Sequence, residues 1–125
     1  MGKNAPTLPE TAAFLEAAEA AGPRDHALAC LLALNGLTVE AVCGARASDL
    51  RRQEGRGELA VSLIGGRPVP MPIPPRTLSA LEDHLAGRDE GPLLLADDGS
   101  PLGIQEAHGI VRRLVRAAGL THRLD

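Results

Sequence analysis

The chain has 125 residues, 13 lysines and arginines against 16 aspartates and glutamates, and a formal net charge of −3. This length predicts one domain whose core needs no metal or disulfide. Phe14 is the only aromatic residue, which excludes nucleic-acid binders that stack single-stranded bases on aromatic rings. Because acid exceeds base, any affinity for DNA has to come from a local basic patch.

The first 35 residues predict two helices. Residues 1–8 are expected to form a flexible lead-in, and residues 9–21 carry alanine and leucine on one helical side and glutamate on the other. Residues 24–35 are apolar on almost every side, which predicts a central, buried helix. Gly22 and Pro23 separate the two, since glycine ends helices and proline suits a first turn.

A third, short helix is predicted after the second. Thr38 is its expected N-cap, and it ends near Ala45. Ser48-Asp49 then opens a turn. Residues 51–57 are charged and contain glycine, so we expect a loop there.

A β-hairpin follows the expected loop. Residues 58–64 and 67–73 alternate enough to predict two strands, and Gly65-Gly66 between them predicts a two-residue turn. The second strand has a proline at every other position. All the missing N–H groups then lie on one side, which places this strand at a sheet edge.

The last third of the sequence predicts two more helices. They cover residues 76–86 and 104–118, with a short buried strand at 92–96 and a turn at 97–101 between them. The complete order predicts an α+β fold that is mainly α, with helices around a small antiparallel sheet.

The sequence also excludes several kinds of site. Cys30 and Cys43 lie in apolar segments without a nearby cysteine partner, which predicts free thiols. The histidines are too scattered to be metal ligands, and no glycine-rich nucleotide motif occurs, so we expect no cofactor, metal or small-molecule substrate. The sequence has no 18-residue apolar run and no signal-peptide pattern, which favours a cytoplasmic protein without membrane contact.

Four segments, in this order, resemble the tyrosine recombinase (phage-integrase) family. They are RDHALACLLALNGLTVEAVCGARASDL, VSLIGGRPVPMPIPP, GPLLLADDGSPLG and RRLVRAAGL. The resemblance covers nearly the whole chain. It implies that residues 9–125 form a single domain like the front part of that family's catalytic domain.

The resemblance also implies a defined chemistry. In the family a tyrosine attacks a DNA phosphate, two arginines clamp its oxygens, and a lysine in the hairpin protonates the leaving oxygen. Here Thr38 holds the place of the first arginine, Ala41 that of its supporting glutamate, and Ile64 that of the lysine. The second catalytic box, His-x-x-Arg, would lie beyond residue 125. Residues 122–125 are not that box, because Asp125 stands where its arginine would be. The resemblance therefore implies no recombinase activity.

Three groups of residues are candidates for contact with DNA. The first is an arginine before the hairpin, which either meets a phosphate or pairs with Asp49 as a surface residue. The second is the hairpin turn, which either approaches the minor groove or is simply a tight turn. The third is a basic stripe on the last helix, which either meets phosphates or complements the helix dipole. The candidates are Arg46, Gly65, Gly66, Arg67, Arg112, Arg113 and Arg116.

Two hypotheses about function follow from these residues. The first is a catalytically inactive integrase-like domain, derived from DNA recombination machinery, with residual affinity for duplex DNA. The alternative is a protein-interaction or dimerisation module without DNA binding, which pairs with itself or with an active recombinase. The chain is equally compatible with a remnant of a decayed mobile element or a piece of a longer domain.

Overall fold

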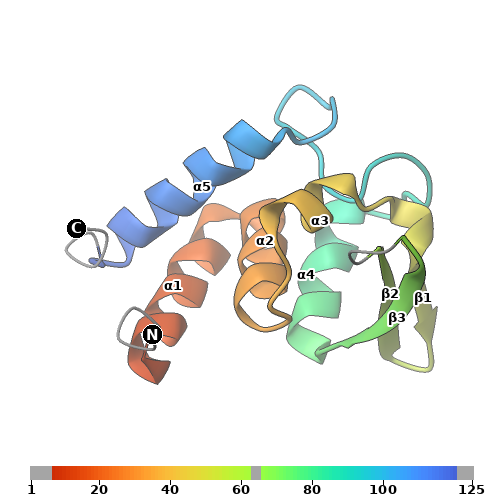
Figure 1. Cartoon of the computed structure of the whole chain (residues 1–125). Coiled ribbons are helices and arrows are strands. Elements are labelled where there is room, and N and C mark those ends of the chain that lie inside the picture. The colour runs from red at the N-terminus through yellow and green to blue at the C-terminus, as the bar shows by residue number, and fades with distance from the viewer. Residues whose placement is uncertain (1–6, 63–65, 121–125) are drawn as a thin grey trace.

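The computed structural model describes residues 7–62 and 66–120, and it has the mainly helical α+β fold that the sequence predicts. Five α-helices pack beside a three-stranded antiparallel sheet of order β1-β2-β3, which lies at one end of the molecule (Figure 1). The elements are α1 (Leu8–Ala21), α2 (Pro23–Ala33), α3 (Val39–Gly44), the 3-10 helix η2 (Ala47–Asp49), β1 (Leu50–Gln53), β2 (Arg56–Ser62), β3 (Pro68–Ile73), α4 (Pro75–Leu85) and α5 (Ile104–Ala117).

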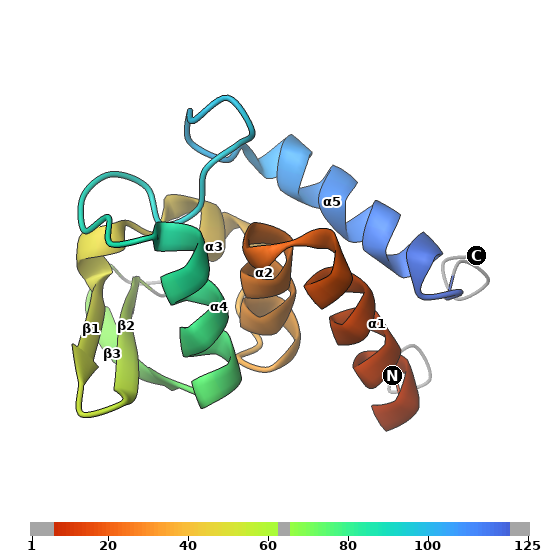
Figure 2. The same ribbon diagram turned by 180° about the vertical axis from the view of Figure 1, so that it is seen from behind.

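Helix α2 lies at the centre of the molecule. Its residues from Ala27 to Leu31 have no exposed surface, as expected for a helix that is apolar on nearly all sides. Helices α1 and α5 lie at one end and the sheet at the other, with α4 between α2 and the sheet (Figures 1 and 2). The prediction that the second helix, α2, is central and buried is confirmed.

The first helix begins one residue earlier than predicted. Thr7 Oγ1 accepts a hydrogen bond from Glu10 N at 3.2 Å, and Thr7 N donates to Glu10 Oε1 at 2.8 Å. This reciprocal capping box sets the helix start at Leu8. The predicted lead-in is therefore wrong at its last two residues, and residues 1–6 lie outside the described part of the chain.

The charged segment 51–57 is not the loop that its composition predicted. Leu50 to Gln53 pair with Arg56 to Leu59, and Glu54 and Gly55 form a two-residue turn with φ values of 52° and 78°. Such positive φ angles match the twist of a tight hairpin. The strand is hard to recognise because only Leu50 is buried, while the other three residues are exposed.

The second hairpin has a different register from the one predicted. Ser62 lies opposite Pro68, so five residues separate the last pair. A two-residue turn at Gly65-Gly66 would instead have paired Ile64 with Arg67. Ile64 and Gly65 lie outside the described residues, but the strand register contradicts the predicted turn.

The prolines of β3 explain the observed register. Gln53 and Arg56 close the first turn, so alternate residues of β2, including Leu59, direct their backbone groups toward β3. Leu59 lies opposite Met71, which has an N–H to donate. The predicted register would have placed Pro72 there, without a donor. The edge position predicted for this strand is confirmed.

The apolar run 92–96 is a buried loop segment rather than a strand. Its only ladder pairs in the described residues are single bridges, from Pro92 to Arg46 and from Leu95 to Pro101. Leu93 N donates to Ala45 O at 2.9 Å. Leu93 and Leu94 are buried in the core, so the hydrophobicity that predicted a strand instead anchors this loop.

Candidate nucleic-acid interface

Thr38 caps the helix at which the resemblance implies a catalytic arginine. Its Oγ1 accepts a hydrogen bond from Ala41 N at 3.1 Å, which confirms the predicted N-cap. Ala41 packs against the hydrophobic core. Both positions therefore serve the start of α3, and neither carries a charge.

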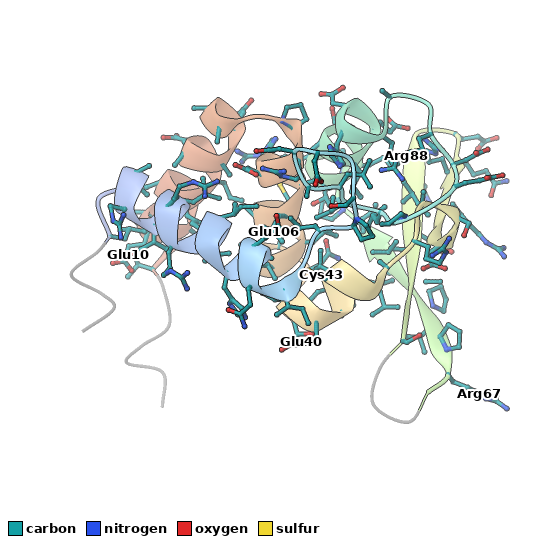
Figure 3. The ribbon with its side chains drawn as sticks, turned by 90° about the horizontal axis from the view of Figure 1, so that it is seen from above. Glu10, Glu40, Cys43, Arg67, Arg88 and Glu106 are labelled. Atoms are coloured by element: carbon teal, nitrogen blue, oxygen red, sulfur yellow. The ribbon has the colours of Figure 1, made fainter. Side chains whose placement is uncertain are left out.

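The surface between α3 and α5 is acidic. Burial raises the pKa of the Cys43 thiol, and the nearby carboxylates of Glu40 and Glu106 raise it further. Figure 3 shows Glu40 and Cys43 on α3 and Glu106 in the first turn of α5. Two carboxylates beside a half-buried thiol oppose the approach of a phosphate.

Arg46 is exposed, and its backbone rather than its side chain meets Asp49. Arg46 N donates to Asp49 Oδ2 at 2.9 Å. Its guanidinium makes no ion pair within residues 7–62 and 66–120. Both features leave the guanidinium available for an external anion.

The tip of the second hairpin is partly described. Gly66 has a φ of 90°, a conformation that favours glycine. Arg67 is exposed and projects away from the body of the molecule (Figure 3). The remaining candidate of this group, Gly65, lies outside the described residues, as does Ile64, which holds the place of the family's lysine.

The basic stripe on α5 is exposed along the second half of the helix. The opposite side of the helix, with Ile110 and Leu114, is buried in the core. No acidic residue follows Glu106 up to residue 120. None of the three stripe arginines forms an ion pair with a described residue; they are Arg112, Arg113 and Arg116.

The candidate residues form two separate groups. Arg46 and Arg67 belong to the segments at the sheet end, whereas the C-terminal half of α5 points away from the sheet (Figures 1 and 2). Arg116 lies in the last turn of α5, where a cation also complements the helix dipole.

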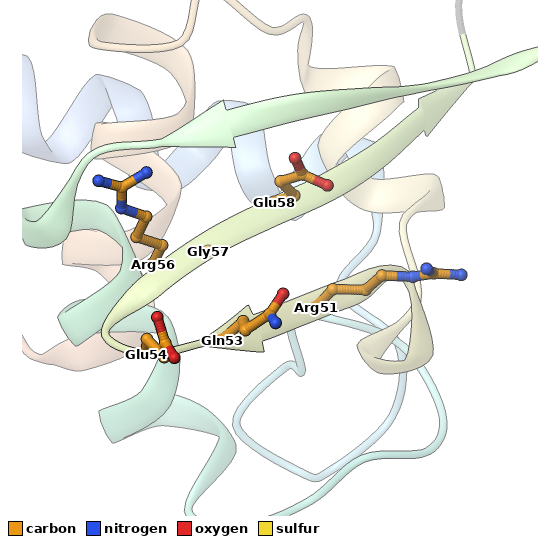
Figure 4. Close-up of a pocket in the computed structure, with 6 residues that line it drawn as sticks. All are labelled: Arg51, Gln53, Glu54, Arg56, Gly57 and Glu58. Atoms are coloured by element: carbon orange, nitrogen blue, oxygen red, sulfur yellow. The ribbon is translucent and has the colours of Figure 1, made fainter.

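A shallow hollow of about 480 Å³ lies on the outer face of the first hairpin. Figure 4 shows its lining from β1, β2 and the turn between them. Arg51 lies opposite Glu58 in the strand register. Cations and anions alternate here, so the hollow offers no net attraction for phosphate. Its lining residues are Arg51, Gln53, Glu54, Arg56, Gly57 and Glu58.

The sequence did not reveal a network around Arg24. Arg24 Nε donates to Asp25 Oδ1 and Nη1 to Asp97 Oδ1, both at 2.9 Å. Nη1 also donates to Leu95 O at 3.2 Å. The only signal in the sequence is the neighbouring charge pair at the start of α2, because the other partners lie 71 and 73 residues away.

The fold is that of part of a tyrosine recombinase, which confirms the fold implied by the resemblance. One matching structure is the crystal structure of XerA recombinase, with a TM-score of 0.76 and 22% sequence identity. It covers 92% of this chain and 43% of the XerA chain, so this chain spans less than half of that protein. No family model and no curated protein matches the chain. None of the described helices is long and apolar enough to cross a bilayer.

Proposed function

We propose that this chain is a recombinase-like domain that performs no strand exchange by itself and keeps a weak affinity for duplex DNA. The hydrogen bond from Ala41 N to Thr38 Oγ1, 3.1 Å long, carries the proposal. At the position where the resemblance implies the first arginine, a neutral side chain caps a helix.

The chemistry of phosphoryl transfer supports this proposal. Charge builds up on the phosphate oxygens in the transition state, and guanidinium groups stabilise it through paired, charge-assisted hydrogen bonds. A threonine hydroxyl that already accepts a backbone hydrogen bond offers no such charge. The 125 residues also contain no tyrosine to act as the nucleophile.

Exposed arginines support the residual affinity for DNA. Arg46 and Arg67 near the sheet and the stripe on α5 have no ion-pair partner among the residues that the structure describes. Each can meet a backbone phosphate and release a counterion. The net charge of −3 and the acidic surface at Glu40 and Glu106 oppose binding, so the affinity is weak.

A nicked, fluorescent suicide duplex tests both halves of the proposal. Fluorescence anisotropy should show binding at low salt that weakens as salt rises, because phosphate contacts release counterions. A denaturing gel of the same mixture should show no covalent protein–DNA adduct. An active recombinase under the same conditions is the positive control, and an adduct formed by the pure chain would contradict the proposal.

A second candidate function rests on the acidic surface between α3 and α5. Glu40 and Glu106 favour a protein partner there over a phosphate. In this case the chain is an interaction or dimerisation module that pairs with itself or with an active recombinase. Absence of DNA binding at low salt, together with a dimer in size-exclusion chromatography with light scattering, would support it over the first.

A further inference from the structure

The segment that joins α4 to α5 contains no helix or strand, and side chains hold it in addition to the backbone hydrogen bonds of Gly91 and Leu93 to residues 47 and 45. It comprises residues 86–103. Arg88 donates hydrogen bonds to the carbonyl oxygens of Glu90, Pro92 and Leu93. These hydrogen bonds fix the first half of the segment.

Two side chains hold the Leu95 backbone in the second half. His84 Nε2, from the last turn of α4, accepts a hydrogen bond from Leu95 N at 3.1 Å. On the other side Arg24 Nη1 donates to Leu95 O at 3.2 Å. Asp25 and Asp97 position the Arg24 guanidinium. We call the hydrogen bond between His84 and Leu95 the Leu95 contact.

The Leu95 contact requires a neutral imidazole. A ring nitrogen accepts a hydrogen bond only when it carries no proton, and in the imidazolium ion both nitrogens are donors. Protonation of Nε2 would therefore place the new N–H of His84 directly opposite the N–H of Leu95, so that two donors would face each other. The bond would break, and the half-buried ring would carry a charge.

The surroundings of His84 also oppose protonation. Burial lowers the pKa of His84 below 6.5, and the guanidinium groups of Arg88 and Arg24 lower it further. The carboxylate of Asp25 acts in the opposite direction. Arg88 lies in the segment after α4, whereas Arg24 and Asp25 belong to α2. Charged groups from that segment and from α2 therefore face the His84 ring.

We propose that the Leu95 contact is a proton-sensitive connection that holds the Leu95 backbone against α4 at neutral pH and releases it in acid, while Leu93 and Leu94 stay anchored in the core. In the released state His84 is exposed and has its ordinary pKa of about 6.5. As pH falls through this value, the released state binds the proton before the closed state does. The connection is therefore complete above about pH 6.5 and weakens as pH falls toward the lower pKa of the closed state.

Hydrogen exchange of the Leu95 amide, followed by NMR, tests this proposal. The measured rate is divided by the intrinsic rate at each pH between about 7.5 and about 5.5. We expect protection to fall by up to about tenfold for each pH unit that separates the two pKa values. Constant amide protection in the middle of α4 distinguishes local release from unfolding of the whole chain.

Two substitutions of matched chemistry make the test specific. In His84→Gln the side-chain carbonyl accepts the same N–H without titrating, so protection should not depend on pH. In His108→Gln an exposed histidine on α5 is removed, and the response of the unmodified protein should remain. The proposal would be overturned if protection of the Leu95 amide did not change with pH in the unmodified protein. It would also be overturned if protection in His84→Gln fell with pH as much as in the unmodified protein.

Discussion

The hydroxyl of Thr38 satisfies a backbone donor that the helix itself leaves without a partner. The first N–H groups of any helix lack an intrahelical acceptor, and Thr38 Oγ1 accepts the one from Ala41. An arginine at this position could not accept that bond. Thr38 therefore stabilises the local fold and supplies no charge at this position.

Replacing Thr38 should reveal its structural role. Thr38→Ala removes the cap and should lower the free energy of unfolding by about 1 kcal/mol. Thr38→Ser keeps an acceptor oxygen and should be close to the unmodified protein. Urea denaturation followed by circular dichroism measures both. Equal stability of the alanine and serine variants would show that the hydrogen bond contributes nothing.

At the residue scale, the sequence predicts contacts between near neighbours best. The Thr38 cap is only three residues from its partner and could be predicted from the preference of threonine for this position. The hydrogen bond between His84 and Leu95 joins residues 11 apart, and that between Arg24 and Asp97 joins residues 73 apart. Their formation depends on how α2, α4 and the joining segment pack, which no local pattern encodes.

The packing of α4 on the sheet depends on the absence of a side chain in β2. A Cβ atom added at Gly57 would lie 2.9 Å from Leu78 Cδ1 and 3.0 Å from Ile73 Cγ1. Both neighbours are buried, so neither can move freely. The close approach of helix and strand therefore requires glycine at this position.

Substitution of Gly57 tests this packing. Gly57→Ala should lower the free energy of unfolding by about 1–3 kcal/mol, because an extra methyl group overpacks the space beside Leu78 and Ile73. Gly44 is a matched control, since a Cβ there meets nothing within 4 Å. Gly44→Ala should be neutral or stabilising by about 0.4–1 kcal/mol. Thermal unfolding of the two variants is measured in parallel. A melting temperature of Gly57→Ala no lower than that of Gly44→Ala would show that the contact between α4 and β2 has room for a Cβ atom.

At the element scale, the sequence predicts the helices well and the sheet poorly. Both ends of each of the five helices lie within two residues of the prediction, because apolar periodicity and glycine or proline at helix ends are local signals. Strand β1 has only Leu50 buried, so periodicity could not reveal it. The register of β3 depends on which residues of β2 face it, and this is decided by the unpredicted first turn.

Across the described part of the molecule, the candidate arginines lie at two ends, and an acidic surface lies between α3 and α5. This division predicts that the proposed affinity for DNA depends on separate contacts rather than on one pocket. Removal of the α5 stripe should then weaken binding without abolishing it. The hairpin arginine should contribute independently, since Arg67 projects from the sheet end of the molecule, away from α5 (Figure 3).

Salt titrations of charge variants measure these contributions. Combined alanine substitution of Arg112, Arg113 and Arg116 should reduce the slope of log affinity against log salt by about 0.9 for each phosphate that the stripe neutralises. Arg67→Ala should reduce it by about the same amount for its single phosphate. Arg56→Ala removes one charge at the opposite end of the sheet and should leave the slope unchanged. An unchanged slope in the triple variant would exclude the stripe from the interface.

The outer edge of β3 affects how copies of this protein behave in concentrated solution. Pro68, Pro70 and Pro72 direct only carbonyl groups outward, and Asn35 Nδ2 already donates to Pro72 O at 3.0 Å. A strand from another copy would find acceptors but no donors along this edge, so cross-β growth cannot begin there. We expect aggregation through β3 to be suppressed, so that any ordered assembly of this chain has to use other surfaces, such as the opposite sheet edge at β1 or the helices.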